Sequence, residues 1–414
     1  MNTCFVSFFL SADRIHGNFS AGGKKPAVTI ASMLSTKSLS MRLPIVYRCV
    51  FGNRSWMRRH NWYAFFIFSN TGKTRWGGGL HRIFFMKFIH TFGEVISVEN
   101  LLAAWKEFVK GKRRRHDVQE FQLRLMEHIL TLHECLCNRT YRHDSYRHFK
   151  IYEPKERDIH KATVRDRLLH RALYRILYPF FDQEFIYDSY SCRVGKGTHL
   201  ALNRFYSFAS WLGENGKRTC YILKCDIRKF FANIDHAILL NIQARSIPDT
   251  DILRLLKEII NSFNSETTGK GLPLGNLTSQ LFVNIYMNEF DQFVKDELKV
   301  KYYIRYADDF VIFSQNKDFL YSIISLLSRF LSEKLRLALH PDKISIATLA
   351  SGVDFLGWVH FPNHRVLRTA TRRRMLKRVN EHNFFSYVGL CKHGNTFALQ
   401  KRILASYSST HART

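Results

Sequence analysis

The sequence lacks any long apolar run. The stretches 1–12 and 61–72 are each 12 residues long, lack charged residues and contain Ser, Asn or Thr, and the longer uncharged stretch 271–288 has 18 residues but is interrupted by Gly, Pro, Asn, Thr, Ser and Gln. A helix that spans a membrane needs about 20 apolar residues, so we predict no transmembrane segment and no membrane partner. No basic residue precedes the apolar residues of the first stretch and no clear cleavage site follows them, which argues against a secretory signal peptide.

Cysteine is present but shows no functional pattern. The eight cysteines form no Cys-x-x-Cys pair, the spacing typical of zinc and redox sites. A chain of 414 residues with 46% hydrophobic residues can form a core without disulfides. We therefore expect a reducing, cytoplasmic compartment.

Acidic residues are scarce relative to basic ones. The 63 Lys and Arg residues face only 34 Asp and Glu residues, which gives a formal net charge of +29. A folded chain this basic typically binds a polyanion, because each cation that neutralises a phosphate releases a condensed counterion. Composition favours a nucleic-acid partner, with general basicity of the ribosomal kind as the alternative.

Repeats and low-complexity tracts are also absent, and helical and strand patterns are mixed, so the predicted fold class is α+β. Residues 1–85 follow no regular apolar period and form either an extension outside the core or a small basic domain. A helix from Val98 and an amphipathic helix from Phe121 through Leu132 are predicted next. Further expected strands are 221–227, 301–306, 310–314, 343–347 and 354–360, a hairpin is expected over 149–164, and further helices are 165–181, 251–263, 278–298 and 319–335.

Three carboxylates stand out from this pattern. Asp308 and Asp309 occupy the tip of a hairpin between two strands that are too apolar to be exposed, and Asp226 ends another apolar strand. Carboxylates gathered there would repel one another unless a cation shared them, and hard oxygen ligands suit Mg²⁺. The residues therefore favour metal-dependent phosphoryl transfer on a nucleic acid. A noncatalytic RNA-binding protein and a Mg²⁺-dependent nuclease are the alternatives.

The chain resembles reverse transcriptases over about residues 150–360. Five blocks follow one another in the order typical of that family: Asp226–Phe231, Gly271–Gln280, Tyr306–Asp309, His340–Lys343 and Phe355–Trp358. The resemblance implies an RNA-directed DNA polymerase that makes cDNA from a template RNA, a primer and deoxynucleoside triphosphates. It also implies a right-hand fold with palm and fingers, and a bacterial or phage gene.

The resemblance assigns the catalytic roles. Asp226 and Asp308 would bind two Mg²⁺ ions, with Mn²⁺ as a substitute, and Asp309 would assist. The main-chain carbonyl of Ile227 would be a further ligand. Lys343 would lie near the departing pyrophosphate, and the alternative is an ordinary surface lysine after a Pro-Asp turn.

The resemblance also assigns residues that bind the nucleotide and the primer. Arg157, with help from Lys155, would grip the triphosphate, and the ring of Phe231 would lie under the sugar and exclude a 2′-hydroxyl. The remaining nucleotide contacts are expected at Leu274, Gly275 and Gln280, and the primer grip at Phe355, Leu356 and Gly357. The expected divisions are N-terminal helices and fingers over 86–220, palm over 221–364 with finger residues around 240–275, and a short basic thumb over 365–414.

One block departs from most reverse transcriptases. The segment Leu274–Gln280 has Leu where the family at large has Gln, and it ends in Ser-Gln instead of Ser-Pro. This variant, together with the segment Ile186–His199, resembles the enzymes of diversity-generating retroelements. That subfamily implies error-prone synthesis and a small basic accessory protein, whereas a group II intron-like or an abortive-infection (phage defence) enzyme is the alternative.

Overall fold

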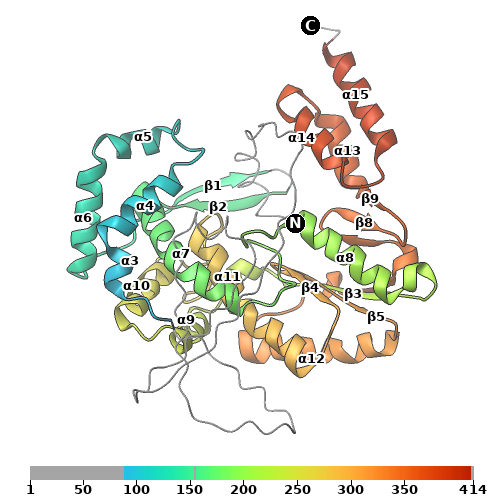
Figure 1. Ribbon diagram of the computed structural model, residues 1–414, viewed down its shortest axis with the longest axis horizontal. Coiled ribbons are helices and arrows are strands. Elements are labelled where there is room, and N and C mark those ends of the chain that lie inside the picture. Colours follow the sequence, from blue (N-terminus) through green and yellow to red (C-terminus); the bar gives the residue numbers. More distant parts are fainter. Residues whose placement is uncertain (1–87, 153–154, 412–414) are drawn as a thin grey trace, which may run out of the picture. The chain divides into compact units, whose positions relative to one another are not determined.

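A four-stranded antiparallel sheet organises the chain (Figure 1). The computed structural model describes residues 88–152 and 155–411, so the extension expected over 1–85 lies outside the described part. The strands are β3 (Tyr221–Asp226), β4 (Tyr303–Tyr306), β5 (Asp309–Ser314) and β6 (Ser345–Thr348), in the order β4-β5-β3-β6. The mixture of helices with an antiparallel sheet confirms the predicted α+β class.

Both faces of this sheet are buried, because alternate residues of each strand enter two different cores. Leu223, Phe310 and Ile312 belong to a core with helices on one side, and Ile222 and Val311 belong to the core on the other. On the first side, α12 (Lys317–Leu335) packs on β3 and β5. On the second, α8 (Thr198–Leu212) packs on β4 and β5, and Figure 1 shows these two helices on opposite sides of the strands.

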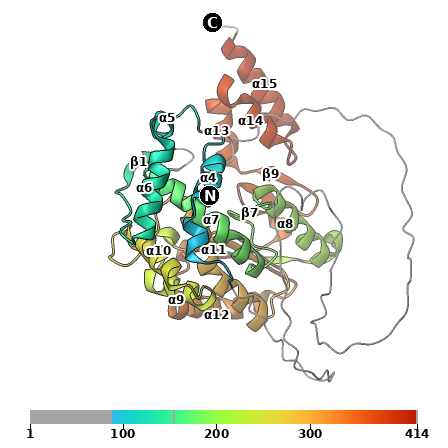
Figure 2. The ribbon, with the colours of Figure 1, turned by 60° about the vertical axis from the view of Figure 1, so that its left-hand side comes forward.

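A group of helices precedes and flanks the sheet. Helix α7 (Val164–Glu184) packs on α4 (Val98–Phe108) and on α11 (Leu277–Gln292), which continues into a π-helical turn over Phe293–Glu297. The others are α3 (Phe92–Ile96), α5 (His116–Leu123), α6 (Leu125–Cys137), α9 (His236–Ser246) and α10 (Thr250–Asn261), with short 3₁₀ turns at Glu214–Gly216 and Phe230–Asn233. Figure 2 shows α5 and α6 from a second side.

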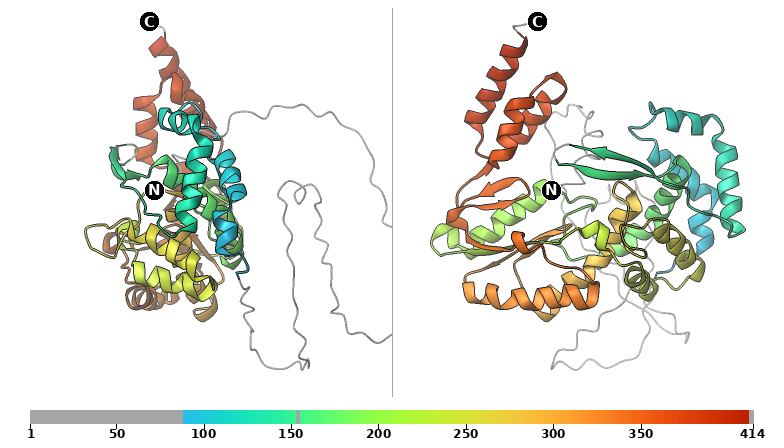
Figure 3. Two further views of the ribbon diagram at one scale, coloured as in Figure 1. Left: turned by 90° about the vertical axis from the view of Figure 1, so that its left-hand side faces the viewer. Right: turned by 180° about the vertical axis from the view of Figure 1, so that it is seen from behind.

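Two smaller sheets complete the architecture. The hairpin β1 (Arg147–Ile151) and β2 (Arg157–Lys161) precedes α7. After the 3₁₀ turns Pro341–Lys343 and Leu349–Ser351, a three-stranded sheet forms from β7 (Val353–Phe355), β8 (Trp358–His360) and β9 (Arg365–Leu367). The chain then enters α13 (Thr369–Arg378), α14 (Glu381–Cys391) and α15 (Phe397–His411), which Figure 3 shows from two further directions.

Three local predictions were wrong. The helix expected through Phe121 and Leu132 is broken into α5 and α6 at Arg124, whose φ of −120° and ψ of 39° are not helical. The strand expected over 354–360 is a hairpin, because Leu356 and Gly357 both adopt positive φ angles and reverse the chain. Lys343 lies in a 3₁₀ turn that precedes the strand predicted to contain it.

The described residues contain no helix that is both long enough and apolar enough to cross a bilayer.

Candidate active site

The register of the central sheet brings carboxylates from two strands together. Asp226, the last residue of β3, pairs directly with Asp309, the first residue of β5. Asp308 precedes Asp309 in the turn from β4, and its carbonyl accepts a hydrogen bond of 3.2 Å from the backbone N–H of Ile227. Residues paired across antiparallel strands have Cβ atoms about 5 Å apart. The three carboxyl groups therefore share one end of the sheet.

The turn that carries two of them has a strained backbone. Ala307 and Asp308 form a two-residue connection between Tyr306 and Asp309, which pair with each other. Ala307 has a φ of 56°, in the left-handed region, whereas Asp308 does not have a positive φ. This pattern is that of a type II′ turn, where glycine is the usual residue at the first position. The carbonyl of Ala307 accepts a hydrogen bond of 3.2 Å from Nη1 of Arg305.

Crowding raises the pKa values of two of the carboxyl groups. Burial, followed by the neighbouring Asp308 carboxylate, raises the pKa of Asp309 to about 7. Burial and the Asp226 carboxylate likewise raise the pKa of Asp308. Both effects arise because the negative form is poorly solvated and repelled by its neighbour. The site therefore carries more negative charge than its protein surroundings neutralise.

Lys343 partly compensates this charge. Its ammonium group donates a hydrogen bond of 2.8 Å to Oδ1 of Asp226, and the Lys343 side chain is 45% exposed. The loop before it is tied to the end of β3, because the N–H of His340 donates to the carbonyl of Asp226 and the N–H of Arg228 to that of Ala338. The structure thus places Lys343 on one of the carboxylates.

The carboxyl oxygens of this site are donor atoms of the kind that a divalent metal ion needs. In residues 88–152 and 155–411, no three His, Cys, Asp or Glu side chains already converge as a metal cage. Asp226, Asp308 and Asp309 nevertheless offer hard oxygen atoms, and the raised pKa values of the latter two show unmet negative charge. Carboxylate oxygens are the ligands that Mg²⁺ and Mn²⁺ prefer. The residues fit divalent cations once the Lys343 ammonium group leaves Asp226.

Phe231 follows Asp226 by five residues in the sequence, and a second segment anchors it. It is half-buried in the 3₁₀ turn after β3, and its ring meets that of Phe230 edge-on at 5.6 Å. Its carbonyl accepts a hydrogen bond of 2.8 Å from the N–H of Leu272. The turn is thereby joined to the segment that leads to Leu274.

The segment around Leu274 docks on the β1–β2 hairpin. The carbonyl of Leu274 accepts from the N–H of His160 at 3.2 Å, and Nδ2 of Asn276 donates to the carbonyl of His160 at 3.1 Å. Gly275 has a φ of 104°, and a Cβ there would lie 3.2 Å from Cγ2 of Ile159. Gly275 therefore permits a close approach of the hairpin. Asn276 is a positioning residue that sequence reasoning missed.

The other residues expected to bind the nucleotide lie on the β1–β2 hairpin and on the segment that docks against it. Arg157 begins β2, is half-buried and pairs with Ile151 across the hairpin, whereas Lys155 is exposed in its turn. Gln280 lies on the first turns of α11, and its carbonyl accepts from Nδ2 of Asn284 at 3.3 Å. Hydrogen bonds at His160 thus link the strand that carries Arg157 to the segment before Gln280.

The three residues expected to grip a primer form the turn between β7 and β8. Phe355 is fully buried, with its ring stacked on Phe205 at 5.4 Å, and Leu356 is 4% exposed. Gly357 has a φ of 87°, and its carbonyl accepts from the N–H of Arg368 at 3.0 Å. The side chains of Phe355 and Leu356 therefore pack inside, and Gly357 is the partly exposed residue of the three.

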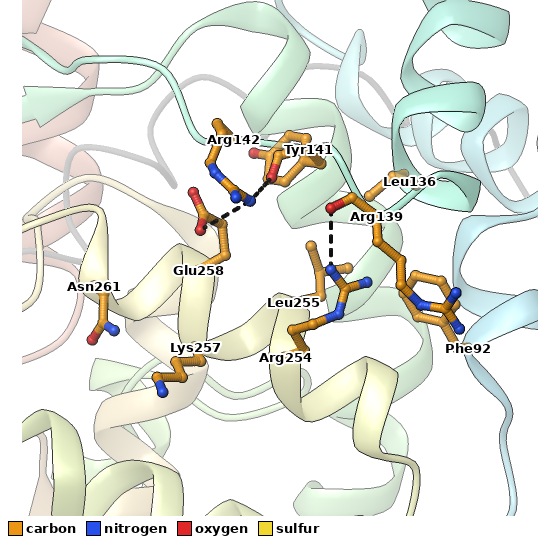
Figure 4. Close-up of a pocket in the computed structure, with 10 residues that line it drawn as sticks. All are labelled: Phe92, Leu136, Arg139, Tyr141, Arg142, Arg254, Leu255, Lys257, Glu258 and Asn261. Atoms are coloured by element: carbon orange, nitrogen blue, oxygen red, sulfur yellow. Dashed lines mark hydrogen bonds and ion pairs between the residues drawn. The ribbon is translucent and has the colours of Figure 1, made fainter.

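A pocket of about 280 Å³ lies elsewhere, between α3, α10 and the end of α6 (Figure 4). Arg142 points toward Glu258, and Arg254 donates to the carbonyl of Arg139 at 3.2 Å. Arg139 in turn pairs with Asp251 at 2.7 Å. Its lining residues are Phe92, Leu136, Arg139, Tyr141, Arg142, Arg254, Leu255, Lys257, Glu258 and Asn261. Carboxylates already pair with all three of its arginines, and none of the three site carboxylates lines it.

Comparison with known proteins places the chain among similar sequences. Residues 153–360, half of the chain, match the family described as "Reverse transcriptase (RNA-dependent DNA polymerase)". The chain is 25% identical over 264 residues to protein YkfC of Escherichia coli K12, covering 54% of this chain and 67% of the relative. It is 24% identical over 291 residues to the group II intron-encoded protein LtrA of Lactococcus lactis subsp. cremoris, covering 53% of this chain and 46% of LtrA.

Solved structures of similar arrangement include two telomerases. The apo telomerase of Candida tropicalis aligns with a TM-score of 0.42 and 12% identity, covering 59% of this chain and 60% of the telomerase. The telomerase of Candida albicans, solved in complex with a fragment of telomeric RNA, aligns with a TM-score of 0.39 and 11% identity, covering 56% and 49%.

Proposed function

Because the chain belongs to the reverse transcriptase family, we propose that it copies a template RNA into cDNA from deoxynucleoside triphosphates. The observation that carries this proposal is the pairing of Asp226 with Asp309, beside Asp308 in the adjoining turn. The net charge of +29 provides the electrostatic attraction for the template and the primer.

In this proposal the carboxylates hold two divalent cations, Mg²⁺ or its substitute Mn²⁺. Asp226 and Asp308 are the principal ligands, Asp309 assists, and the carbonyl of Ile227 completes the set. Cations bound there stabilise the attacking and leaving oxygens of an in-line phosphoryl displacement. Lys343, released from Asp226, then has an exposed ammonium group that stabilises the leaving pyrophosphate or donates a proton to it.

The nucleotide site is proposed to form where the β1–β2 hairpin meets the segment Leu274–Gln280. Arg157 and Lys155 provide cations for the triphosphate, and Arg binds phosphate oxygens in bidentate fashion. The half-buried ring of Phe231 is proposed to lie under the sugar, where it excludes a 2′-hydroxyl. The docking of Leu274 and Asn276 on His160 supports this arrangement, because it ties the two halves of the site together.

The domain divisions follow from the same proposal. The central sheet and its helices form the palm over 221–364, with finger residues around 240–275, and 86–220 form the N-terminal helices and fingers. Residues 365–414 form a short thumb, and the turn Phe355–Gly357 contacts the primer. The cluster of arginines in α13 supports a thumb that contacts the nucleic-acid backbone.

Three biological settings are proposed, with different support. The likeness to LtrA relates the chain to group II intron-encoded enzymes. The Leu274–Gln280 block supports an error-prone enzyme of a diversity-generating retroelement, which would work with a small basic accessory protein. A phage-defence enzyme is the third setting. Sequencing the RNA and the proteins that copurify with the chain distinguishes them.

Primer extension on an RNA template tests the proposed activity. Wild-type protein with deoxynucleotides and Mg²⁺ should extend the primer, and Asp226→Asn or Asp308→Asn should abolish extension while RNA binding survives. Loss of a metal ligand weakens the stabilisation of charge in the transition state by several kcal/mol. Asp342→Asn, at a carboxylate that is 87% exposed, is the matched control. Degraded template would instead indicate a nuclease, and binding without turnover would indicate an RNA-binding protein.

A further inference from the structure

A fully buried ion pair lies two residues from the carboxylate-bearing turn. Arg305 of β4 donates through Nε to Oδ1 of Asp291 at 2.8 Å and through Nη2 to Oδ2 at 2.7 Å, and both side chains are 0% exposed. Removing two charges from water costs about as much as their attraction returns. A buried ion pair therefore contributes little net stability, and stability alone does not explain this one. The other hydrogen bonds of Arg305 indicate its role.

The guanidinium group of Arg305 also forms hydrogen bonds outside the ion pair, and one of them reaches the turn Ala307–Asp308. Nη1 of Arg305 donates to the carbonyl of Ala307 at 3.2 Å and to Oδ1 of Asn284 at 3.3 Å, and Nη2 donates to Oγ of Ser189 at 3.1 Å. A guanidinium group has five N–H donors, and here each has an acceptor. Asn284 is itself fixed, because its Nδ2 donates to the carbonyl of Ser191 at 2.9 Å. These contacts fix the guanidinium group of Arg305, and its Nη1 donates to the turn.

The carbonyl that it holds belongs to the strained residue. Ala307 has a φ of 56°, and its carbonyl is part of the peptide that joins it to Asp308. A non-glycine residue keeps a left-handed conformation only when its surroundings hold it there. The backbone of Arg305 is anchored independently, since its N–H donates to the carbonyl of Asp188 and its carbonyl accepts from the N–H of Tyr190.

We propose that Arg305 is a positioning residue, whose guanidinium group clamps the Ala307 carbonyl and so fixes the turn that presents Asp308 and Asp309 to the divalent cations. This inference rests on the proposed polymerase function. Arg305 itself does not touch the reacting atoms. Lysine cannot replace it, because an ammonium group on a flexible chain lacks the planar fork that reaches Asp291 and Ala307 together.

The test compares Arg305→Lys with Arg175→Lys. Arg175 lies on α7, donates to Oδ1 of Asn100 at 3.1 Å and pairs with Glu107, so its variant controls for loss of an arginine ion pair elsewhere. Mn²⁺ binding to the free protein is measured by electron paramagnetic resonance, alongside extension kinetics, RNA affinity and Tm. Arg305→Lys should weaken Mn²⁺ binding about tenfold and lower kcat by about tenfold or more, as outer-shell substitutions at metal sites do.

RNA affinity should stay within about twofold, and Arg175→Lys should lower Tm without changing Mn²⁺ binding. Mn²⁺ binding and kcat of Arg305→Lys within about twofold of wild type would overturn the proposal. If Arg305→Lys does not fold, Ser189→Ala replaces it, with an expected loss of roughly threefold in Mn²⁺ affinity. Unchanged Mn²⁺ binding by that variant would likewise overturn the proposal.

A second substitution, in the turn itself, tests whether Arg305 acts through the conformation of Ala307. Glycine adopts a φ of 56° without the cost of a Cβ, so Ala307→Gly in the Arg305→Lys background should recover about threefold of the lost Mn²⁺ affinity. A purely structural role predicts no recovery. If wild-type protein binds Mn²⁺ but extends no primer, the proposed polymerase function is refuted and the proposal for Arg305 is not. The Mn²⁺ affinities of the variants still test whether Arg305 positions the turn.

Discussion

Lys343 donates a hydrogen bond to the Asp226 carboxylate, so the oxygen that is proposed to bind a cation accepts a hydrogen bond from an ammonium group. The ammonium group is 45% exposed, whereas the Asp226 side chain is 11% exposed. The lysine can therefore swing into solvent, but the carboxylate cannot. Binding of a divalent cation and the pairing with Lys343 are mutually exclusive at that oxygen.

This competition predicts opposite effects of one substitution on binding and on catalysis. In Lys343→Met the competing ammonium group is absent, so Mn²⁺ should bind the free protein about threefold to tenfold more tightly. We expect kcat to fall roughly 100-fold, the lower end of what a positioned proton donor contributes. Metal titration and single-turnover extension measure the two effects. Lys334→Met, at an exposed lysine of α12, is the control, and weaker Mn²⁺ binding by Lys343→Met would contradict the competition.

The buried amide of Asn276 is predicted to hold the hairpin over the nucleotide. Asn276→Ala removes the hydrogen bond to His160 and should cost about 1 to 2 kcal/mol in the free energy of unfolding. Because Arg157 lies on the same strand as His160, the KM for deoxynucleotides should rise about threefold to tenfold while kcat changes less. Asn276→Asp keeps the size but loses the donor and buries a carboxylate beside the His160 carbonyl, so the KM should rise at least as much and the free energy of unfolding should fall further than in Asn276→Ala. A KM equal to that of wild type in both variants would exclude the coupling.

Local rules predicted where the three carboxylates lie along the strands, whereas their role as metal ligands stays a prediction. The two apolar runs on either side of Ala307–Asp309 predict a hairpin, because the connection between them is so short. Asp226 ends a third apolar run. The pairing partner of that third strand was not predictable from these rules, since no local rule sets the register of strands more than 80 residues apart.

The supporting contacts could not be predicted from sequence. Arg305 in a strand pattern suggests an exposed residue, and its partner Asp291 lies on a helix with no motif to link them. The break at Arg124 was missed because apolar residues on both sides keep a helical spacing, although the backbone departs from it. At Leu356 and Gly357 the pattern of a strand hid a reversal that only the φ angles reveal.

A buried histidine predicts how stability depends on pH. His170 is 1% exposed, neither ring nitrogen has a hydrogen-bond partner, and burial lowers its pKa to about 3. In the unfolded chain the group is protonated below its ordinary pKa of about 6.5, but in the folded protein it stays neutral, so stability falls as the pH decreases below that value. At pH 5 this linkage should cost about 2 kcal/mol relative to neutral pH.

His170→Phe should remove this part of the pH dependence and raise Tm at pH 5, because a ring of similar size replaces two unpaired polar atoms. Thermal unfolding of both proteins between pH 5 and pH 8 measures the effect. His116→Phe, at a side chain that is 86% exposed, is the control and should leave the pH dependence unchanged. Parallel curves for wild type and His170→Phe would contradict this account.

Leu274 offers a test of fidelity that leaves the architecture undisturbed. Its contact with the hairpin is made by its carbonyl, which accepts from the N–H of His160, so a change of side chain preserves that hydrogen bond. The half-buried Leu side chain offers only apolar contact, which is non-directional and tolerates a displaced base pair. A Gln amide can form a hydrogen bond that is well aligned only with a correct pair. Such a bond contributes about 0.5 to 1.5 kcal/mol, or roughly twofold to twelvefold in discrimination.

We therefore expect Leu274→Gln to lower the error rate of cDNA synthesis by roughly twofold to twelvefold. Leu274→Met is the matched control, because it keeps the volume but adds no hydrogen-bond donor, and its error rate should equal that of wild type. Sequencing cDNA made by the three proteins on one template, at equal nucleotide concentrations, gives the comparison. If Leu274→Gln and Leu274→Met have the same error spectrum as wild type, Leu274 only packs against its neighbours. The error-prone character would then need another cause, while the proposed polymerase chemistry at Asp226 and Asp308 would stand unaffected.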